Sequence, residues 1–295
     1  MDKSLAKNNF LIKRTRHGVD NRVYFLTNKN NKKLGVLKLY NKRSLKEVLH
    51  IKKTMEFLAR KKVPVQKIKK FLIKEKKPAL FMEYIEGRHS TLSSNKKIRE
   101  SAYLMASFHN LRIPNFLEDK KITDKDYKKL FKACSDWEKI NKIQMVYNAI
   151  SMDYLGFLPK GVVHGDFSCS NILFNKNDKI LGLLDCDHCC LSYFLTDLAR
   201  AQIFFSFDKK NRLNKKKIKN FIKYYNNKRL LEKKEKENFL SHLRLVLIKM
   251  ILETYYYVEV IKEVKFMSTK YNQSYNNLYE KMENLREADI IDIFV

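Results

Sequence analysis

Residues 161–188 read GVVHGDFSCSNILFNKNDKILGLLDCDH, and this stretch carries the residues that decide the fold. Asp166 and Asn171 share a short loop between two apolar runs, and Asp185 follows the next apolar run, ILGLLD. Two neighbouring hairpins would bring these three oxygen-bearing side chains to one pocket. Hard cations such as Mg²⁺ take ligands of this kind, usually one or two carboxylates together with phosphate oxygens. The spacing therefore predicts a site for a metal-bound phosphate compound, as phosphoryl transfer requires.

Upstream of this segment, the chain predicts a small β-rich lobe. The runs FLIKRT, RVYFLT and GVLKLY are short, apolar or alternating, and separated by polar turns, which is typical of a strand meander. Residues 45–59 have a helical period that ends before Pro64. The runs KKFLIKE and PALFMEYIEG then predict two further strands, and Gly87 follows as a break.

From about residue 95 onward, helical patterns dominate. Apolar residues between Ile98 and His109 fall on one helical face, and those between Leu243 and Ile251 form a second amphipathic stripe. We expect His109 and Trp137 to lie in the core. The predicted fold class is α+β, with a β-rich lobe at residues 1–87 and a larger, mainly helical lobe at residues 88–295.

The segments HGDFSCSNILF, LLDCDH and TDLAR together resemble the aminoglycoside phosphotransferase, choline kinase and homoserine kinase type II superfamily. The resemblance extends over residues 10–205, and it implies the protein-kinase-like fold, with a small antiparallel N-lobe and a mainly helical C-lobe. The implied function is an ATP-dependent kinase that phosphorylates a hydroxyl of a metabolite or an aminoglycoside-like compound. The segments GVDNRVYFL and PALFMEYIEG most resemble the homoserine kinase branch, which favours that branch.

The resemblance also implies roles for the residues around the catalytic loop. Asp166 would be the catalytic carboxylate that orients the acceptor hydroxyl. Asn171 and Asp185 would hold Mg²⁺ on the ATP phosphates, and Asp187 would bind a second metal or support the first. His164 would be structural, and Asp197 would accept hydrogen bonds from the loop backbone.

Nucleotide-binding residues are implied in the first lobe. Gly18 and Asn21 lie in HGVDNRVYFL, where the family has its phosphate-covering loop. Lys38 corresponds to the lysine that pairs with phosphate, and it shares a strand face with Val36 and Tyr40, opposite Leu37 and Leu39. We expect Glu47 to be its ion-pair partner, with Glu56 as a weaker alternative. The segment Glu83, Tyr84 and Ile85 would hydrogen-bond adenine through its backbone.

Two other constellations suggest different chemistry. The cysteines and histidines at positions 164, 169, 186, 188, 189 and 190 could form a zinc site, but they lack a second spaced cysteine pair. The run Tyr255–Tyr257, with Glu253 and Glu259 nearby, could form an aromatic cage for a quaternary ammonium group. The same run is also explained by a helix whose tyrosine rings lie partly in the core with their hydroxyl groups in solvent.

Composition limits the function classes. The chain has 295 residues, 44% of them hydrophobic, and 61 Lys and Arg against 32 Asp and Glu give a net charge of +29. The lysines are spread along the chain instead of forming a stripe with aromatics, so we do not expect nucleic acid as a partner. No apolar run is long enough to span a membrane, and the N-terminus is polar, so a cytoplasmic protein is expected.

The expected partners are therefore ATP, Mg²⁺ and a small hydroxyl-bearing substrate, and the sequence carries no signal for an oligomeric state. Other classes remain as alternatives: a non-catalytic ATP-binding pseudokinase, a protein Ser/Thr kinase and an RNA-binding protein. The joint presence of Lys38, Asp166, Asn171 and Asp185 favours an active enzyme. The short spacing between Asp185 and Asp197 disfavours a protein kinase, which needs a longer substrate-docking segment.

Overall fold

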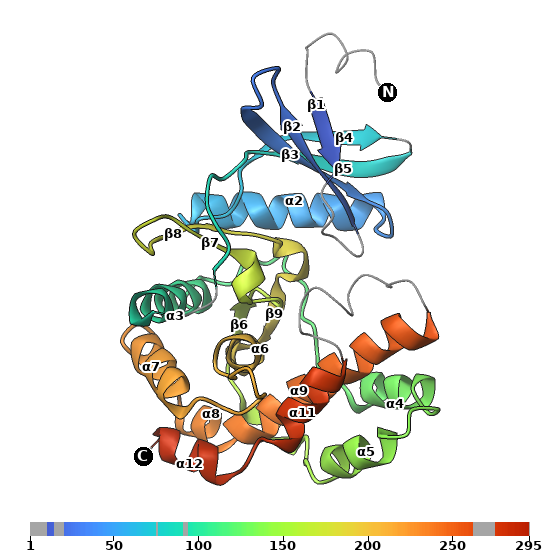
Figure 1. Ribbon diagram of the computed structural model, residues 1–295, viewed down its shortest axis with the longest axis vertical. Helices are drawn as coiled ribbons and strands as arrows, with labels where there is room; N and C mark the ends of the chain where they lie inside the picture. Colours follow the sequence, from blue (N-terminus) through green and yellow to red (C-terminus); the bar gives the residue numbers. More distant parts are fainter. Residues whose placement is uncertain (1–10, 15–20, 75, 91–93, 262–274, 295) are drawn as a thin grey trace. The chain divides into compact units, whose positions relative to one another are not determined.

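The computed structural model describes residues 11–14, 21–74, 76–90, 94–261 and 275–294 (Figure 1). The chain divides into two compact units: the first comprises Met1–Ser90 and Ser170–Cys189, and the second comprises Thr91–Cys169 and Cys190–Val295. Within the described part of the chain, no helix combines the length and the apolar character needed to cross a membrane.

The first unit is built on an antiparallel sheet with the strand order β1-β2-β3-β5-β4 (Figure 1). Leu37 and Leu39 of β3 pack with Leu26 and Ala79 in one apolar cluster, so the alternation read from the sequence places Lys38 on the other face. The strands are β1 (Leu11–Arg14), β2 (Asn21–Thr27), β3 (Lys33–Tyr40), β4 (Ile68–Lys74) and β5 (Lys77–Met82).

Helix α2 (Leu45–Arg60) follows the third strand and buries an apolar face that includes Val48, Ile51 and Leu58. It begins with a capping box, in which the Ser44 side chain accepts from the Glu47 N–H and the Glu47 carboxylate accepts from the Ser44 N–H. After its last turn, Lys62 adopts a positive φ of 61° and the chain turns towards β4.

A short hairpin, β7 (Ile172–Phe174) and β8 (Ile180–Leu183), also belongs to the first unit. Leu183 forms a parallel bridge with Val65, and Phe174 forms an antiparallel bridge with Arg88. At Gly182 an added Cβ would lie 2.6 Å from Ile85 Cδ1, so a larger residue here would require the Ile85 side chain to move. These contacts explain a difference from the expected lobes 1–87 and 88–295, which placed the hairpin in the second lobe.

The second unit is mainly helical. Helix α3 packs beside α7, and α9 packs beside α6 and α11 (Figure 1). His109 and Trp137 are buried, as predicted. The helices are α3 (Asn95–His109), α4 (Asp124–Ala133), α5 (Ile140–Asn148), α6 (Phe194–Phe205), α7 (Lys215–Asn226), α8 (Lys233–Glu237), α9 (Phe239–Tyr255), α11 (Tyr275–Glu283) and α12 (Ala288–Phe294).

Short elements complete the described chain. Strand β6 (Lys160–Val163) pairs antiparallel with β9 (Cys190–Tyr193), and the loop that carries Asp166 begins directly after β6, at His164. The remaining short helices are η1 (Asp153–Phe157), η2 (Cys169–Asn171), η3 (Cys186–His188) and the π-helical turn η4 (Tyr256–Val260).

Candidate active site

Lys38 lies at the centre of a polar cluster in the first unit. Its Nζ is 2.7 Å from Asp185 Oδ1 and 2.8 Å from Asp187 Oδ2. Burial alone would lower the pKa of Lys38, but the two carboxylates outweigh burial and raise its pKa above the ordinary value. The ammonium group therefore stays charged, which a phosphate-binding lysine needs.

Asp187 anchors this cluster from a buried position. Its Oδ1 accepts from Tyr40 Oη at 3.1 Å, and its Oδ2 accepts from Asn21 Nδ2 at 3.2 Å as well as from Lys38. Burial, followed by the nearby aspartates, raises the pKa of Tyr40, so this hydroxyl is a permanent donor. With three donors already on its two oxygens, Asp187 keeps little capacity for the metal ion that the resemblance implied.

Asp185 differs from Asp187 in exposure and backbone. Its side chain is 42% exposed, against 4% for Asp187. It adopts left-handed dihedrals, with φ 59° and ψ 55°, directly before η3. Asn171 lies at the same end of the β7–β8 hairpin, because Ile172 pairs with Leu183 and Leu184 N donates to Asn171 O. A carboxylate and an amide oxygen at one hairpin end fit the hard-oxygen ligand set of Mg²⁺.

Glu47 does not pair with Lys38, so that expectation is corrected. Its carboxylate lies at the first turn of α2, where it accepts from Ser44 N and Oγ at 2.7 Å. Glu56, the weaker alternative, pairs instead with Lys52 at 2.7 Å. The two aspartates that follow β8 supply the negative charge that the prediction assigned to the helix.

The remaining predicted nucleotide residues give a mixed result. Gly18 lies outside the described residues, and Asn21 contacts Asp187 as stated above. The N–H of Glu83 donates to Lys67 O at 2.9 Å, and its C=O accepts from Gln66 Nε2 at 3.1 Å. The N–H and the C=O of Glu83 are thus both engaged within the first unit.

In the second unit, Asp197 organises the catalytic loop. It accepts from His164 N at 2.6 Å and from Gly165 N at 2.8 Å, as the sequence predicted. Burial alone would raise the pKa of Asp197, but hydrogen bonds from His109 and the loop lower it below its ordinary value. Gly165 has a φ of 76°, which only glycine adopts without strain, and it turns the chain into Asp166.

Asp166 forms a close ion pair that the prediction missed. Arg200 Nη2 and Nε lie 2.6 Å and 2.8 Å from Asp166 Oδ1, and both side chains are 24% exposed. His164 is fully buried and its Nδ1 accepts from Asp166 N at 3.2 Å, which fits the predicted structural role. The signal for Arg200 was present, because Asp197 and Arg200 are three residues apart on α6 and share a helix face.

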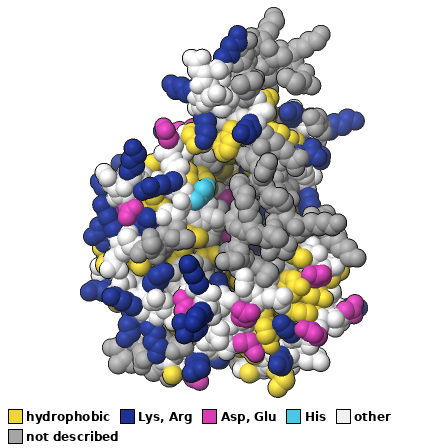
Figure 2. Space-filling view, viewed as in Figure 1, with side chains coloured by type: hydrophobic (Ala, Val, Ile, Leu, Met, Phe, Trp, Pro, Cys, Tyr) yellow, Lys and Arg dark blue, Asp and Glu magenta, His cyan; other side chains and the backbone are white. Residues whose placement is uncertain are grey.

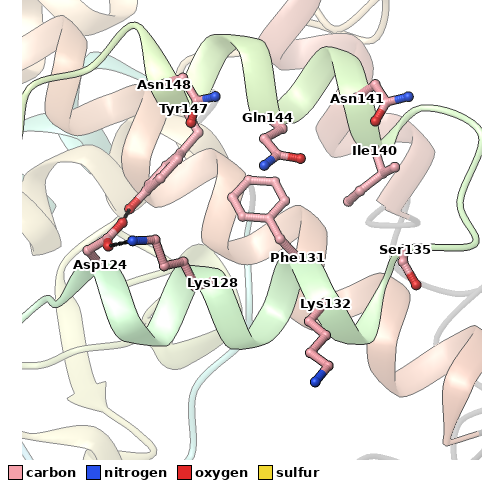
Figure 3. Close-up of a pocket in the computed structure, with 10 residues that line it drawn as sticks. All are labelled: Asp124, Lys128, Phe131, Lys132, Ser135, Ile140, Asn141, Gln144, Tyr147 and Asn148. Atoms are coloured by element: carbon pink, nitrogen blue, oxygen red, sulfur yellow. Dashed lines mark hydrogen bonds and ion pairs between the residues drawn. The ribbon is translucent and has the colours of Figure 1, made fainter.

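A cavity of about 520 Å³ lies elsewhere in the second unit, between α4 and α5 (Figure 3). Phe131 and Gln144 face each other across it, and at its end Asp124 accepts from Tyr147 Oη at 2.6 Å and pairs with Lys128 (Figure 3). None of the predicted catalytic or metal residues lines this cavity.

Ring packing engages the aromatic run that suggested a cage. Trp137 stacks on Tyr255 at 4.7 Å with an interplanar angle of 14°, and Tyr275 meets Tyr255 edge-on at 5.1 Å, so these rings pack on one another. Of the residues named for zinc, Cys186, His188 and Cys189 belong to the first unit, and His164, Cys169 and Cys190 belong to the second. Lys and Arg side chains are spread over much of the visible face in Figure 2.

Comparison with known sequences identifies a family. The model of a family described as "Phosphotransferase enzyme family" matches residues 12–226, which is most of the chain. No significant match was found among curated protein sequences.

Solved structures share the fold at low identity. A choline/ethanolamine kinase family protein from Mesorhizobium loti matches with a TM-score of 0.70 and 12% identity, over 98% of this chain and 94% of that one. Choline kinase from Cryptosporidium parvum matches with a TM-score of 0.63 and 16% identity, over 96% of this chain and 90% of that one. A spectinomycin phosphotransferase solved with ADP and spectinomycin matches with a TM-score of 0.63 and 12% identity, over 96% of this chain and 91% of that one. These likenesses confirm the kinase-like α+β fold predicted from the sequence.

Proposed function

The chain belongs to the phosphotransferase enzyme family, and on this premise we propose that it transfers the γ-phosphoryl group of ATP to a hydroxyl of a small molecule. The observation that carries the proposal is the Lys38 cluster, in which a buried, permanently charged ammonium group is held between two carboxylates. A lysine so placed can bind phosphate oxygens as a point charge.

Our proposal for the nucleotide side assigns a role to each residue of the first unit. Asn171 and Asp185 would hold Mg²⁺, which supplies charge neutralisation on the phosphates when bound. Asp187, Tyr40 and Asn21 hold Lys38 in place. ADP is present in the structure of the spectinomycin phosphotransferase, which supports ATP as the donor.

On the acceptor side, Asp166 would orient the acceptor hydroxyl and receive its proton late in transfer. Arg200 and the backbone of the loop fix the position of this carboxylate, the first by a direct ion pair and the second through Asp197. No other described side chain is proposed to touch the reacting atoms.

The acceptor class is a further part of the proposal. Names of the structural neighbours include kinases of choline and ethanolamine and a phosphotransferase of spectinomycin. A net charge of +29 disfavours a polycationic aminoglycoside and is compatible with a neutral or zwitterionic metabolite. The wording of the first lobe favours the homoserine kinase branch. None of the five cysteines, all of which lie in the described part of the chain, forms a disulfide bond, which suits the cytoplasm that we propose as its compartment.

The test is acceptor-dependent ADP release. The wild type and Asp166→Asn are incubated with Mg·ATP and a panel that includes homoserine, choline, a sugar and an aminoglycoside. We expect turnover with at least one acceptor, and a loss of about 10²- to 10⁴-fold in Asp166→Asn. Asp126→Asn, on the exposed first turn of α4, is the matched control and keeps the wild-type rate. Equal turnover in wild type and Asp166→Asn would remove Asp166 from its role. Nucleotide binding without any turnover would favour the pseudokinase.

A further inference from the structure

The catalytic loop is held by a carboxylate that itself has a buried partner. Asp197 is 1% exposed and has both oxygens engaged by the loop N–H groups of His164 and Gly165. The ring of His109 lies behind it, with Nε2 at 3.3 Å from Asp197 Oδ2. The position of the residues just before Asp166 therefore depends on how the His109 ring is held.

The hydrogen-bond partners of His109 define its tautomer. Burial lowers the pKa of His109, in opposition to the hydrogen bond with Asp197, so the ring is neutral. A carboxylate only accepts, so Nε2 carries the proton and donates to Asp197. Nδ1 is then an acceptor, and Tyr225 Oη, at 2.7 Å, donates to it.

The same tyrosine is held by an ion pair. Arg229 Nη1 donates to Tyr225 Oη at 3.0 Å, and the guanidinium group is bidentate on Glu235, at 3.0 Å and 3.1 Å. The Arg229 guanidinium also lies 4.0 Å from the centre of the Phe194 ring. Hydrogen bonds thus run without a gap from Glu235 on α8 to the backbone of the catalytic loop.

The ion pair buries charge that apolar packing would not bury. Glu235 is 0% exposed and is the one buried residue of α8, and its Oε2 also accepts from Glu232 N at 2.9 Å in the capping box of that helix. Buried ion pairs are often no more stabilising than packed apolar residues, whereas they fix orientation. Burial raises the pKa of Glu235, although the contact with Arg229 lowers it, because the charged carboxylate has lost its contact with water.

We propose that Tyr225, Arg229 and Glu235 form a positioning relay that, through His109 and Asp197, holds the loop backbone at His164 and Gly165 and so sets the turnover rate. The relay residues touch neither substrate nor nucleotide; they act through the loop that presents Asp166. The role in turnover rests on the proposed phosphoryl transfer, whereas the hold on the loop backbone does not.

The test compares two tyrosine hydroxyls. Tyr225→Phe removes the donor to His109, and Tyr127→Phe removes a buried hydroxyl that donates to Leu245 O at 3.1 Å, away from the loop. We expect kcat to fall about 10-fold or more in Tyr225→Phe, the size found when orienting partners are removed, with the KM for ATP unchanged. Tyr127→Phe is expected to keep the wild-type kcat.

Hydrogen exchange measures the hold on the loop independently of activity. The amides of His164 and Gly165 are expected to exchange faster in Tyr225→Phe and at the wild-type rate in Tyr127→Phe. Equal exchange of these amides in the two variants overturns the relay, even if the enzyme is active. If no acceptor is turned over by the wild type, the proposed function fails while the exchange rates still decide the relay. Glu235→Gln, which keeps the side-chain shape, takes the place of Tyr225→Phe if that variant does not fold.

Discussion

Replacing either aspartate that contacts Lys38 by asparagine is expected to affect a different property of the protein, stability in one case and turnover in the other. Asp187→Asn should destabilise the protein strongly, whereas Asp185→Asn should abolish turnover and leave the stability nearly unchanged. Both changes remove one negative charge from the same ammonium group at almost the same distance, 2.8 Å and 2.7 Å. The difference in outcome therefore comes from burial and from the other donors on each carboxylate.

The cost at Asp187 follows from its donors. Lys38, Tyr40 and Asn21 all direct hydrogen-bond donors at its oxygens, and the side chain is 4% exposed. An asparagine turns an NH₂ group towards at least one of them and leaves the buried ammonium group with one partner fewer. Breaking a buried ion pair in this way costs about 3–5 kcal/mol.

At Asp185 the same change is much cheaper for folding. The side chain is 42% exposed, so solvent screens its pair with Lys38, and the expected loss is under about 1 kcal/mol. Its φ of 59° also favours asparagine, which adopts left-handed dihedrals more readily than most residues. Turnover falls nonetheless, because an amide is a poorer Mg²⁺ ligand than a carboxylate.

Urea unfolding and ADP release, measured on both variants, check this prediction. The unfolding midpoint should move far to lower urea in Asp187→Asn and hardly at all in Asp185→Asn, with the slope unchanged in both. The reasoning is refuted if Asp185→Asn is the more destabilised variant, or if both variants stay within about 1 kcal/mol of the wild type.

Three further predictions concern the second unit. Arg200→Ala should lower kcat about 10- to 100-fold, and Arg200→Lys should restore only part of it, because lysine cannot place two nitrogens on Asp166 Oδ1 in the fixed geometry of a guanidinium group. Full activity of Arg200→Ala in the ADP assay would contradict this. Burial lowers the pKa of Lys281 from 10.5 to about 8. Its charge therefore reduces the stability of the folded protein below pH 8, and this destabilisation disappears as the pH rises from 8 to 10.5, the pKa of lysine in the unfolded chain. Lys281→Met should therefore gain up to about 3 kcal/mol in urea unfolding at pH 7 and nothing at pH 10.5, and a gain that is equal at both values would be inconsistent with this. Gly165→Ala should cost about 1–2 kcal/mol in urea unfolding through its positive φ and lower kcat as well, and wild-type values of both would argue against strain at this position.

Local patterns predicted most of the fold and part of the site. Period-two alternation placed Lys38 opposite Leu37 and Leu39, an inference that needs only neighbouring residues. The contact of Asp197 with the loop N–H groups was implied by the resemblance of TDLAR to the family, because Asp197 lies 33 residues from His164. A local rule would also have corrected Glu47, since Ser44 and Glu47 form the S-x-x-E signature of a capping box.

The partners of Asp187 could not be predicted in this way. Tyr40 and Asn21 are separated from it by 147 and 166 residues, and no spacing rule joins positions that far apart. Arg229 and Glu235 are close to each other in sequence but reach the catalytic loop only through Tyr225 and His109, on two other helices. Such chains of contacts exist only once the helices have packed.

Exposure and donor count separate the carboxylates that can react from those that support them. Asp187 and Asp197 are 4% and 1% exposed and each accepts from at least three donors, which leaves either carboxylate little capacity for a metal or a proton. Asp185 and Asp166 are 42% and 24% exposed and meet a cation on one oxygen. In the sequence all four are aspartates in or beside apolar runs, and the phosphoryl transfer that we propose would need the second pair exposed, because metal and acceptor would have to reach it. Asp187 holds the Lys38 ammonium group in place, and Asp197 holds the loop backbone at His164 and Gly165.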